Sequence, residues 1–263
     1  MRPVKNLAIP PQPPRIHQCL QALRASPAQF YCPGLFYDSI AASTNARESL
    51  VALFKYGQSK HSDVLVKVGG FRIGTLHDFR KTEHRSGIAD PAEGRKTIEH
   101  PVRDEVFVGG SARSAALADT FGLHTGPKGR IRISGIQLQR VVDSEDLFIF
   151  CLASRFSRAV LKQFDGADAC VKVSRPTRFF GALTESLNAR VPVEFLGFAP
   201  VHYRERSEQW NGIDIGEHPA VIKELEFAPQ CEVRALWRPK ERGDIEPFVV
   251  ESSAVCRYCE RVL

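Results

Sequence analysis

The sequence predicts an α+β fold with mixed or antiparallel sheets and short peripheral helices, arranged around a central cleft. About seven segments show the alternation or the apolar run that is typical of a β-strand. The helical segments between them are short and do not alternate regularly with the strands, which disfavours a parallel α/β sheet. With 263 residues, of which 43% are hydrophobic, the chain can bury a substantial core.

The N-terminal part of the chain is expected to lie outside the sheets. Residues 1–14 contain five prolines and no periodic pattern, which is typical of an extended arm, and a short helix is expected at 15–24. Residues 25–44 are rich in proline, serine and aromatic residues and are expected to form a packed loop. The predicted organisation is a Pro-rich arm and loop over residues 1–44 and a single α+β domain over residues 45–263.

The domain is expected to begin with a strand, a helix and a second strand. A strand is predicted at 53–57 and a helix at 61–68, which Gly69 and Gly70 end. The second strand is predicted at 71–76. Later strands are predicted at 130–142, 147–153, 169–173, 230–238 and 248–250, and the segments 194–200 and 201–204 are expected to be extended. Short helices are expected at 156–164, after Ser174 to about residue 188, and at 218–225.

Local patterns add detail to these elements. Residues 147–153 are apolar throughout, which indicates a central strand buried on both faces. Ser174, before Pro176, is expected to cap the helix that follows it. The side chains expected to face inward from the strand at 130–142 are Ile131 and Ile133, with Ile136 and Leu138 as further candidates.

The stretch from 77 to 101 is expected to be a long loop. Its composition is too polar and too strongly charged for a core segment. Long loops in compact domains are usually functional or disordered. We therefore expect a mobile flap beside the cleft, whose truncation would weaken activity more than stability.

The strand predicted at 230–238 carries the most informative side chains. Because side chains alternate along a strand, Gln230 and Glu232 are expected to project from one face, together with Arg234 and Arg238. Such a polar and charged face is not expected to pack in a hydrophobic core. It is either exposed to solvent or forms the wall of a cleft.

The net charge of +6 is unevenly distributed. Residues 1–140 hold 20 Lys and Arg against 11 Asp and Glu, whereas residues 141–263 hold 16 against 19. Such an excess can form a surface for phosphate groups, or it can be an ordinary solvated basic face. No recognised nucleic-acid-binding motif accompanies the charge.

Several classes of protein are disfavoured. No apolar run approaches the length that spans a bilayer, and the N-terminus lacks the apolar segment of a signal peptide. Seven cysteines at irregular spacing argue against a secreted disulfide framework, so we expect a soluble cytoplasmic protein. The glycine patterns of Rossmann and P-loop nucleotide sites and the serine nucleophile elbow are missing.

The cysteines offer little further chemistry. Cys256 and Cys259 have the internal spacing of zinc ligands, but a second pair of ligands is missing. Cys151 and Cys170 lie in apolar strands, where buried thiols are usually inert.

The remaining polar residues suit glycosidic chemistry on a dinucleotide. A carboxylate stabilises the oxocarbenium-like centre that forms as the glycosidic bond breaks, and a guanidinium suits a pyrophosphate. A hydroxyl and an aromatic ring then position the nicotinamide and its ribose. Glu232, Arg72, Ser154 and Tyr56, each near an end of a predicted strand, supply these four groups.

Three short motifs resemble a widespread family of uncharacterised bacterial proteins. They are Leu-Phe-Lys-Tyr at 53–56, Phe-Cys-Leu-Ala-Ser at 150–154 and Gln-Cys-Glu-Val-Arg at 230–234. The stretches 71–80 and 87–94 resemble the same family, so the resemblance covers roughly residues 50–240. More distantly, the three-strand order resembles the ADP-ribosyltransferase superfamily. There an Arg or His lies on the first core strand, a Ser or Tyr element follows, and Gln/Glu-x-Glu lies on a late strand.

The superfamily resemblance implies an ADP-ribosyltransferase-like fold and NAD as the substrate. Glu232 matches the catalytic glutamate, and Gln230 matches the residue two positions before it. Ser154 matches the middle element loosely, because the chain has Cys-Leu-Ala-Ser there.

The first-strand contact to NAD stays open. Arg72 fits the arginine type of this superfamily, whereas Lys55 and Tyr56 occupy the place of the histidine type. The glutamine at position 230 implies an acceptor other than arginine, such as a nucleobase or an amide. The basic first half suits a nucleic-acid acceptor, and by analogy such a bacterial enzyme acts as a toxin or a phage-defence effector.

Two alternatives remain. The first is a nucleic-acid-binding or nuclease-like domain that uses the basic region 71–132 with His77, His84, Asp78 and Asp90. The second is a non-catalytic interaction protein, which binds a partner through the Pro-rich arm and the loop at 25–44.

Overall fold

The computed structural model describes residues 52–81 and 89–263, which all belong to one compact unit. The fold is mixed α+β with mostly antiparallel sheets, as the sequence predicts at this level. The expected arm and loop over residues 1–44, and their boundary with the domain, lie outside the described residues. Within the described ranges, none of the helices has the length and apolar character needed to cross a membrane.

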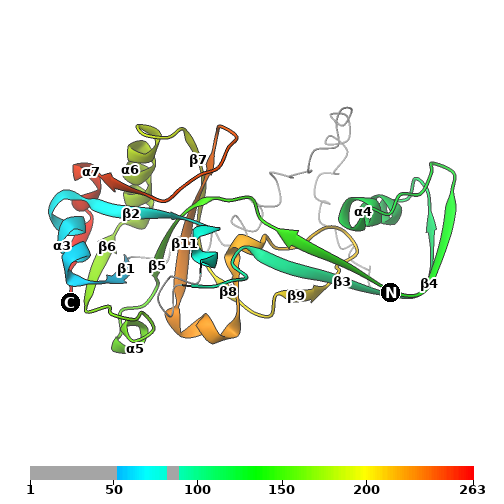
Figure 1. Ribbon diagram of the computed structural model, residues 1–263, viewed down its shortest axis with the longest axis horizontal. Helices are drawn as coiled ribbons and strands as arrows, with labels where there is room; N and C mark the ends of the chain where they lie inside the picture. The colour runs from blue at the N-terminus through cyan, green and yellow to red at the C-terminus, as the bar shows by residue number, and fades with distance from the viewer. Residues whose placement is uncertain (1–51, 82–88) are drawn as a thin grey trace, which may run out of the picture. The chain divides into compact units, whose positions relative to one another are not determined.

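An eight-stranded antiparallel sheet contains most of the expected strands (Figure 1). Its members are β1 (Ala52–Gly57), β2 (Gly70–Thr75), β5 (Phe148–Ala153), β6 (Ala169–Ser174), β7 (Val193–Pro200), β11 (Glu232–Pro239), β12 (Phe248–Glu251) and β13 (Cys259–Arg261). The order along one path is β12-β2-β5-β1-β6-β13, and β11 pairs with both β5 and β7. All of these pairings are antiparallel.

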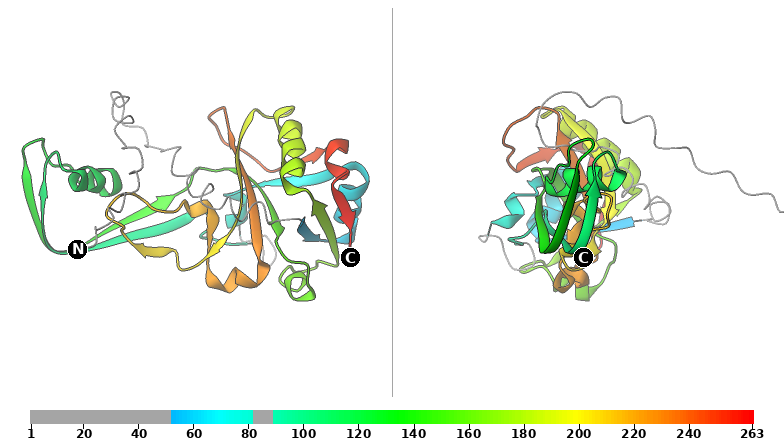
Figure 2. Two further views of the ribbon diagram at one scale, coloured as in Figure 1. Left: turned by 180° about the vertical axis from the view of Figure 1, so that it is seen from behind. Right: turned by 90° about the vertical axis from the view of Figure 1, so that its right-hand side faces the viewer.

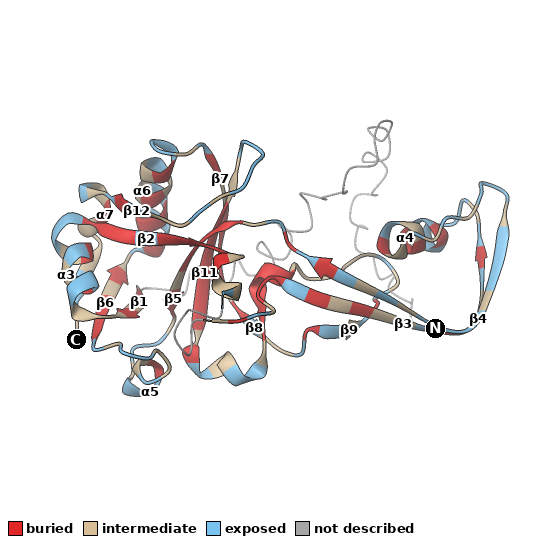
Figure 3. Cartoon of the chain, viewed as in Figure 1, coloured by how far each residue is buried: buried red, intermediate tan, exposed pale blue. Residues whose placement is uncertain are grey.

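The strand β5 is central because its side chains are apolar on both faces. Figure 3 shows β5 and β11 as largely buried. The helix α6 (Pro176–Asn188) packs a stripe of apolar residues, Phe179, Phe180, Leu183 and Leu187, against the sheet. Burying each such side chain contributes about 1.5–3 kcal/mol. Trp237 of β11 joins this core, and its indole N–H donates to the Thr184 hydroxyl at 2.8 Å.

Two helices show how the local sequence sets their ends. The helix α3 (Ser59–Val68) ends at Gly69, which takes a left-handed φ of 68° that glycine adopts without steric cost. The helix α6 starts at Pro176 as expected, but its N-cap is Arg175 rather than Ser174. The expectation fails because Ser174 is the last residue of β6, where its hydroxyl donates to the carbonyl of Tyr258.

A three-stranded sheet holds elements that the sequence pattern predicts only in part. It consists of β4 (Arg130–Asp143), β3 (Arg95–Val108) and β9 (Ser207–Gln209) in that order, with the helix α4 (Ala112–Phe121) between β3 and β4 in the chain. The long strands β3 and β4 run together away from the eight-stranded sheet (Figure 2). The strand at 130–142 is confirmed, whereas β3, β9 and α4 are additions.

The expected inward face of β4 is partly wrong. Ile133 and Leu138 pack against a cluster that contains Trp210, but Ile131 and Ile136 are exposed. The reason is that β4 is an edge strand with a thin core on one side, so few of its apolar residues find a partner.

The expectation of a flap at 77–101 is wrong for the residues that the structure describes. The strand β3 begins at Arg95, and the residues at 89–94 form a tight turn rather than a loose loop. Asp90 and Glu93 in this turn are 3% and 1% exposed. Each is paired with an arginine, Asp90 with Arg206 and Glu93 with Arg234. The charged residues of this turn are therefore buried and ion-paired, and they do not form a solvated loop.

The remaining elements are short. The extended segment at 201–204 contains β8 (His202–Tyr203), which pairs with β10 (Ile222–Lys223). The helix expected at 218–225 is replaced by the 3-10 turn η2 (Pro219–Val221), by β10 and by a second 3-10 turn, η3 (Leu225–Gln230). The helix expected at 156–164 is the single turn α5 (Arg158–Leu161), and α7 (Ser253–Cys256) precedes β13.

Candidate functional site

The candidate site is a cavity formed where the large sheet splits. The strand β11 pairs with every residue of β5 along one edge of β5. The strands β1 and β2 share the other edge. There β2 pairs with Phe148 and Ile149, and β1 pairs at Ala153, so among the described strands none pairs with residues 150–152 on that edge. The helix α3 follows β1 and precedes β2 (Figure 1), and its residues also line the cavity. The resulting cavity of about 720 Å³ is within the range of small-molecule sites.

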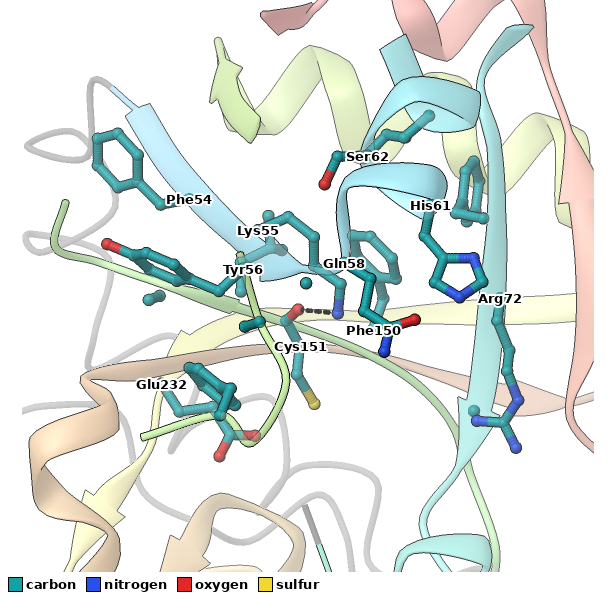
Figure 4. A pocket seen from close by; sticks show the side chains of 18 of the residues that line it. Phe54, Lys55, Tyr56, Gln58, His61, Ser62, Arg72, Phe150, Cys151 and Glu232 are labelled. Carbon is teal, nitrogen blue, oxygen red and sulfur yellow. Dashed lines mark hydrogen bonds between the residues drawn. The ribbon is translucent and has the colours of Figure 1, made fainter. Parts of the chain in front are cut away.

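Lys55 reaches across this split from β1. Its ammonium donates to the carbonyl oxygen of Cys151 at 2.8 Å, the backbone group that the split leaves exposed (Figure 4). The same ammonium lies 4.8 Å from the centre of the Phe150 ring. Burial lowers the pKa of Lys55, although Cys151 and Glu232 act in the opposite direction. The side chain is only half-buried, but its exposed part faces a recess rather than bulk solvent.

Arg72 lines the cavity from β2, beyond Phe150 in Figure 4. One terminal nitrogen of its guanidinium donates to Asp78 at 2.5 Å. The side chain is nearly half exposed, and a guanidinium has five N–H donors. Donors of Arg72 therefore remain for a ligand.

Glu232 contributes a carboxylate that is buried and ion-paired. Its two oxygens accept from the Lys223 ammonium at 2.9 Å and from the Nε of Arg234 at 2.7 Å. Burial alone would raise the pKa of Glu232, but these two cations outweigh it and hold the pKa well below its usual range. The carboxylate is therefore ionised at neutral pH.

The same cluster extends to Glu93. Both terminal nitrogens of Arg234 donate to the two oxygens of Glu93, each at 2.7 Å, in a bidentate pair. Arg234 is 1% exposed, and Glu232 and Glu93 together hold its pKa above its usual value against the effect of burial. Of the two expectations for this face, a solvated surface or the wall of a cleft, the structure agrees with the wall. Its charges form an internal ionic cluster, and the side chains of this cluster that line the cavity are Glu93, Lys223, Glu232 and Arg234.

Gln230 also lines the cavity, but it does not lie on the strand as expected. It ends η3, and Cys231 between Gln230 and Glu232 has a left-handed φ of 49°. The side chains of Gln230 and Glu232 nevertheless converge, because both accept hydrogen bonds from the Lys223 ammonium, at 3.0 and 2.9 Å.

Two predicted site residues turn their hydroxyl groups away from the cavity. The ring of Tyr56 lines the cavity, but its hydroxyl bonds to the backbone of Arg155 and Ser157. Ser154 is not among the lining residues, and its hydroxyl donates to the carbonyl of Cys231 at 3.2 Å. Both hydroxyls therefore stabilise local structure.

The structure thus brings Lys55, Tyr56, Arg72, Gln230 and Glu232 together around one cavity. It adds lining residues that the sequence reasoning does not select, chiefly Glu93, Phe150 and Lys223. The stretch 87–94 quoted for the family resemblance contains Glu93, which is the one signal that points to it. Lys223 carries no such signal, because its role depends on contacts across the fold.

Other chemistry has less support. Burial, with help from Glu232, raises the pKa of the Cys151 thiol well above its usual range, so this thiol stays protonated and is a poor nucleophile. Within the described ranges, His, Cys, Asp and Glu side chains form no group of three that could hold a metal ion. Asp78 and Asp90 of the nuclease-like alternative are each paired with arginine, and His84 lies outside the described residues.

Comparisons with protein-family models, with curated proteins and with solved structures find no match for this chain.

Proposed function

We propose that the cavity binds NAD and that the protein is an ADP-ribosyltransferase-like enzyme. The observation that carries this proposal is the convergence of Lys55 and Arg72, from the first two strands, and Glu232, from the much later strand β11, on one cavity. A dinucleotide requires cations for its pyrophosphate, apolar and aromatic surface for its rings, and an acceptor for its ribose hydroxyls. The cavity supplies all three kinds of group. The finer fold assignment, to the ADP-ribosyltransferase type, belongs to the same proposal.

The aromatic and cationic groups support the binding part of the proposal. Phe54, Tyr56 and Phe150 line the cavity and offer ring surface for a nicotinamide or an adenine. Arg72 and Lys55 offer N–H donors to phosphate oxygens, because guanidinium and ammonium groups form short charge-assisted bonds with oxyanions.

The role of Glu232 follows from its partners. Each carboxylate oxygen has two lone pairs and accepts one bond from Lys223 or Arg234, so acceptor capacity remains besides the hydrogen bond that the Cys151 thiol makes with this carboxylate. These can accept from hydroxyl groups of the nicotinamide ribose. Two adjacent cations offset the charge of Glu232, so we assign it mainly to orienting the ribose and only partly to stabilising the oxocarbenium-like centre.

The proposed reaction breaks the glycosidic bond to nicotinamide, which leaves with the bonding electron pair. A nucleophilic atom of the acceptor then bonds to the ribose carbon and gives up a proton. We propose a nucleic-acid acceptor because positive charge is concentrated in the first 140 residues. Many of these cations already have carboxylate partners, however, as Arg72, Arg80, Lys96 and Arg132 do.

The test is transfer of label from NAD that is radiolabelled in its adenylate phosphate to RNA, DNA or protein acceptors. We expect label on one acceptor class, together with released nicotinamide. Arg72→Ala should weaken NAD binding by roughly 10- to 100-fold, the effect of losing a charge-assisted hydrogen bond worth about 1.5–3 kcal/mol. Arg178→Ala, an exposed arginine of α6, is the matched control. Failure to bind NAD would overturn the proposal.

The balanced charge of the Glu232 cluster favours a second candidate, a ligand-binding protein without catalysis. Glu93 and Glu232 offset Arg234 and Lys223, so little net charge is left to stabilise a cationic transition state. Binding of NAD without nicotinamide release over many hours would identify this second function.

A further inference from the structure

Lys55 differs from the other cations in the interior of the described structure. Those cations each have a carboxylate partner, in the pairs Lys96–Glu208, Arg206–Asp90, Lys223–Glu232 and Arg234–Glu93. In the described part of the chain, no carboxylate forms an ion pair with Lys55, whose contacts are a carbonyl and an aromatic ring. Lys55 is only half-buried, but even partial removal of a cation from water without a counter-charge has a cost, which a ligand anion in the cavity would offset.

The geometry leaves the Lys55 ammonium ready for a ligand. An ammonium group has three N–H donors, and one of them is directed to the carbonyl of Cys151. The carboxylate of Glu232 is close enough to influence Lys55, but both of its oxygens are bound by Lys223 and Arg234. The remaining donors of Lys55 can therefore serve a ligand in the cavity.

A second cation strengthens the case for an anionic ligand. Arg72 lines the same cavity and acts on Lys55 by charge repulsion. Two like charges at one site repel each other, and an anion that contacts both removes this cost. A diphosphate has oxygens on two phosphorus atoms and can accept from an ammonium and a guanidinium at once.

We infer that Lys55 is the anion-binding centre of the cavity and that the ligand supplies its counter-charge through a diphosphate shared with Arg72. The inference rests on the proposed NAD site, because it identifies the part of that ligand which the protein recognises. It also predicts binding of inorganic pyrophosphate alone.

Binding should be coupled to protonation. The charged or titratable groups that act on Lys55 are Cys151, Glu232 and Arg72, and α3 adds Lys60 and His61 to the cavity lining. Across the neutral and alkaline range the Cys151 thiol stays neutral and Glu232 stays ionised, so neither of these two groups changes charge there, whereas Lys55, whose pKa is lowered, does. An anion beside Lys55 raises its pKa, so binding at alkaline pH takes up a proton.

The experiment is calorimetric titration of pyrophosphate into the full chain at pH 7.5. Lys55→Met should weaken binding by at least about 10-fold, since it removes a charge-assisted hydrogen bond. Lys55→Arg should stay within a few-fold of wild type because the charge is kept. Lys67→Met, an exposed lysine of α3 outside the cavity lining, should bind as wild type does. Equal binding by Lys55→Met and wild type would overturn the inference.

A measurement on the wild-type protein keeps the test decisive if Lys55→Met does not fold. Titrations in two buffers with different ionisation enthalpies, repeated from pH 7 to pH 10, give the number of protons taken up. The ligand for this measurement is a diphosphate esterified at both ends, such as dimethyl diphosphate, because inorganic pyrophosphate itself loses a proton in this pH range. We expect proton uptake that grows as the pH rises. Failure of pyrophosphate to bind, or binding of the diester without proton uptake, overturns the inference even if label transfer from NAD is observed. Pyrophosphate binding through Lys55 without any NAD binding would overturn the proposed function alone.

Discussion

Glu232 lies in a cluster of buried charges that balance one another. Glu93 and Glu232 carry two negative charges, and Lys223 and Arg234 carry two positive ones. Removing one partner of such a cluster leaves a charge uncompensated in the interior. This costs more stability than replacing both partners with apolar residues. Glu232 is 6% exposed, so its carboxylate is part of the interior and is expected to contribute to stability.

The first prediction concerns Glu232→Gln. We expect it to lower the free energy of unfolding by about 3–5 kcal/mol, the usual cost of breaking a buried pair by removing one partner. Urea denaturation followed by circular dichroism measures this. Glu226→Gln, on an exposed side chain of η3, is the control and should change stability by less than about 0.5 kcal/mol. Equal stability of Glu232→Gln and wild type would mean that the ion pairs do not form in solution.

A second prediction concerns pH and the contact between His202 and Glu217. The hydrogen bond that the His202 ring donates to the Glu217 carboxylate raises the pKa of His202. The stabilisation is therefore fully present below the unfolded pKa of about 6.5 and is lost as the pH rises through the folded pKa. The melting temperature of wild type should exceed that of His202→Gln by more at pH 5.5 than at pH 8.5. A difference between wild type and His202→Gln that stays constant from pH 5.5 to pH 8.5 would contradict the prediction.

Some residues of the candidate site can be predicted from the sequence alone. Strand alternation and the family resemblance select Lys55, Arg72 and Glu232, and the structure gathers them in one cavity. Alternation does not distinguish an exposed polar face from a buried ionic one, because the difference depends on partners elsewhere in the chain. Here those partners are Glu93 and Lys223, which come from a turn and a two-residue strand.

Elements with a strong local signal are predictable from this sequence. The apolar run at 148–153 is enough to predict the strand β5, and Gly69 is enough to predict where the helix α3 ends. The strand β3 has no such signal, because Pro101 and several charged residues interrupt its alternation. Its strand structure comes from pairing with β4 over nearly its full length, a long-range contact that composition does not encode.

The small core between these strands and α4 supports a third prediction. Leu117 of α4 is 1% exposed and packs in a cluster with Phe107 and Trp210. Leu117→Ala should lower the free energy of unfolding by about 2–5 kcal/mol, because it removes buried area and leaves a cavity. Leu225→Ala, whose leucine is 60% exposed, is the matched control and should have little effect on urea denaturation. If both variants lose the same stability, the cluster is not a core.

At the scale of the whole described structure, the turn at 89–94 connects the two main sheets. It leads directly into β3 of the three-stranded sheet, and Glu93 binds Arg234 of β11 in the large sheet. Asp90 of the same turn binds Arg206, the residue before β9. The buried pair Glu93–Arg234 therefore joins the turn to the large sheet at the cavity wall, and the buried pair Asp90–Arg206 joins the same turn to the three-stranded sheet.

The last prediction tests this connection through Glu93→Gln. The substitution keeps the size of the side chain but removes the charge that faces both terminal nitrogens of Arg234. We expect a loss of about 3–5 kcal/mol in urea denaturation, and no comparable loss for the exposed Glu241→Gln. The cluster gains one positive charge, so pyrophosphate should bind the folded variant more tightly than it binds wild type. A stable Glu93→Gln protein with unchanged pyrophosphate affinity would show that the turn at 89–94 neither holds the sheets together nor sets the charge of the cavity.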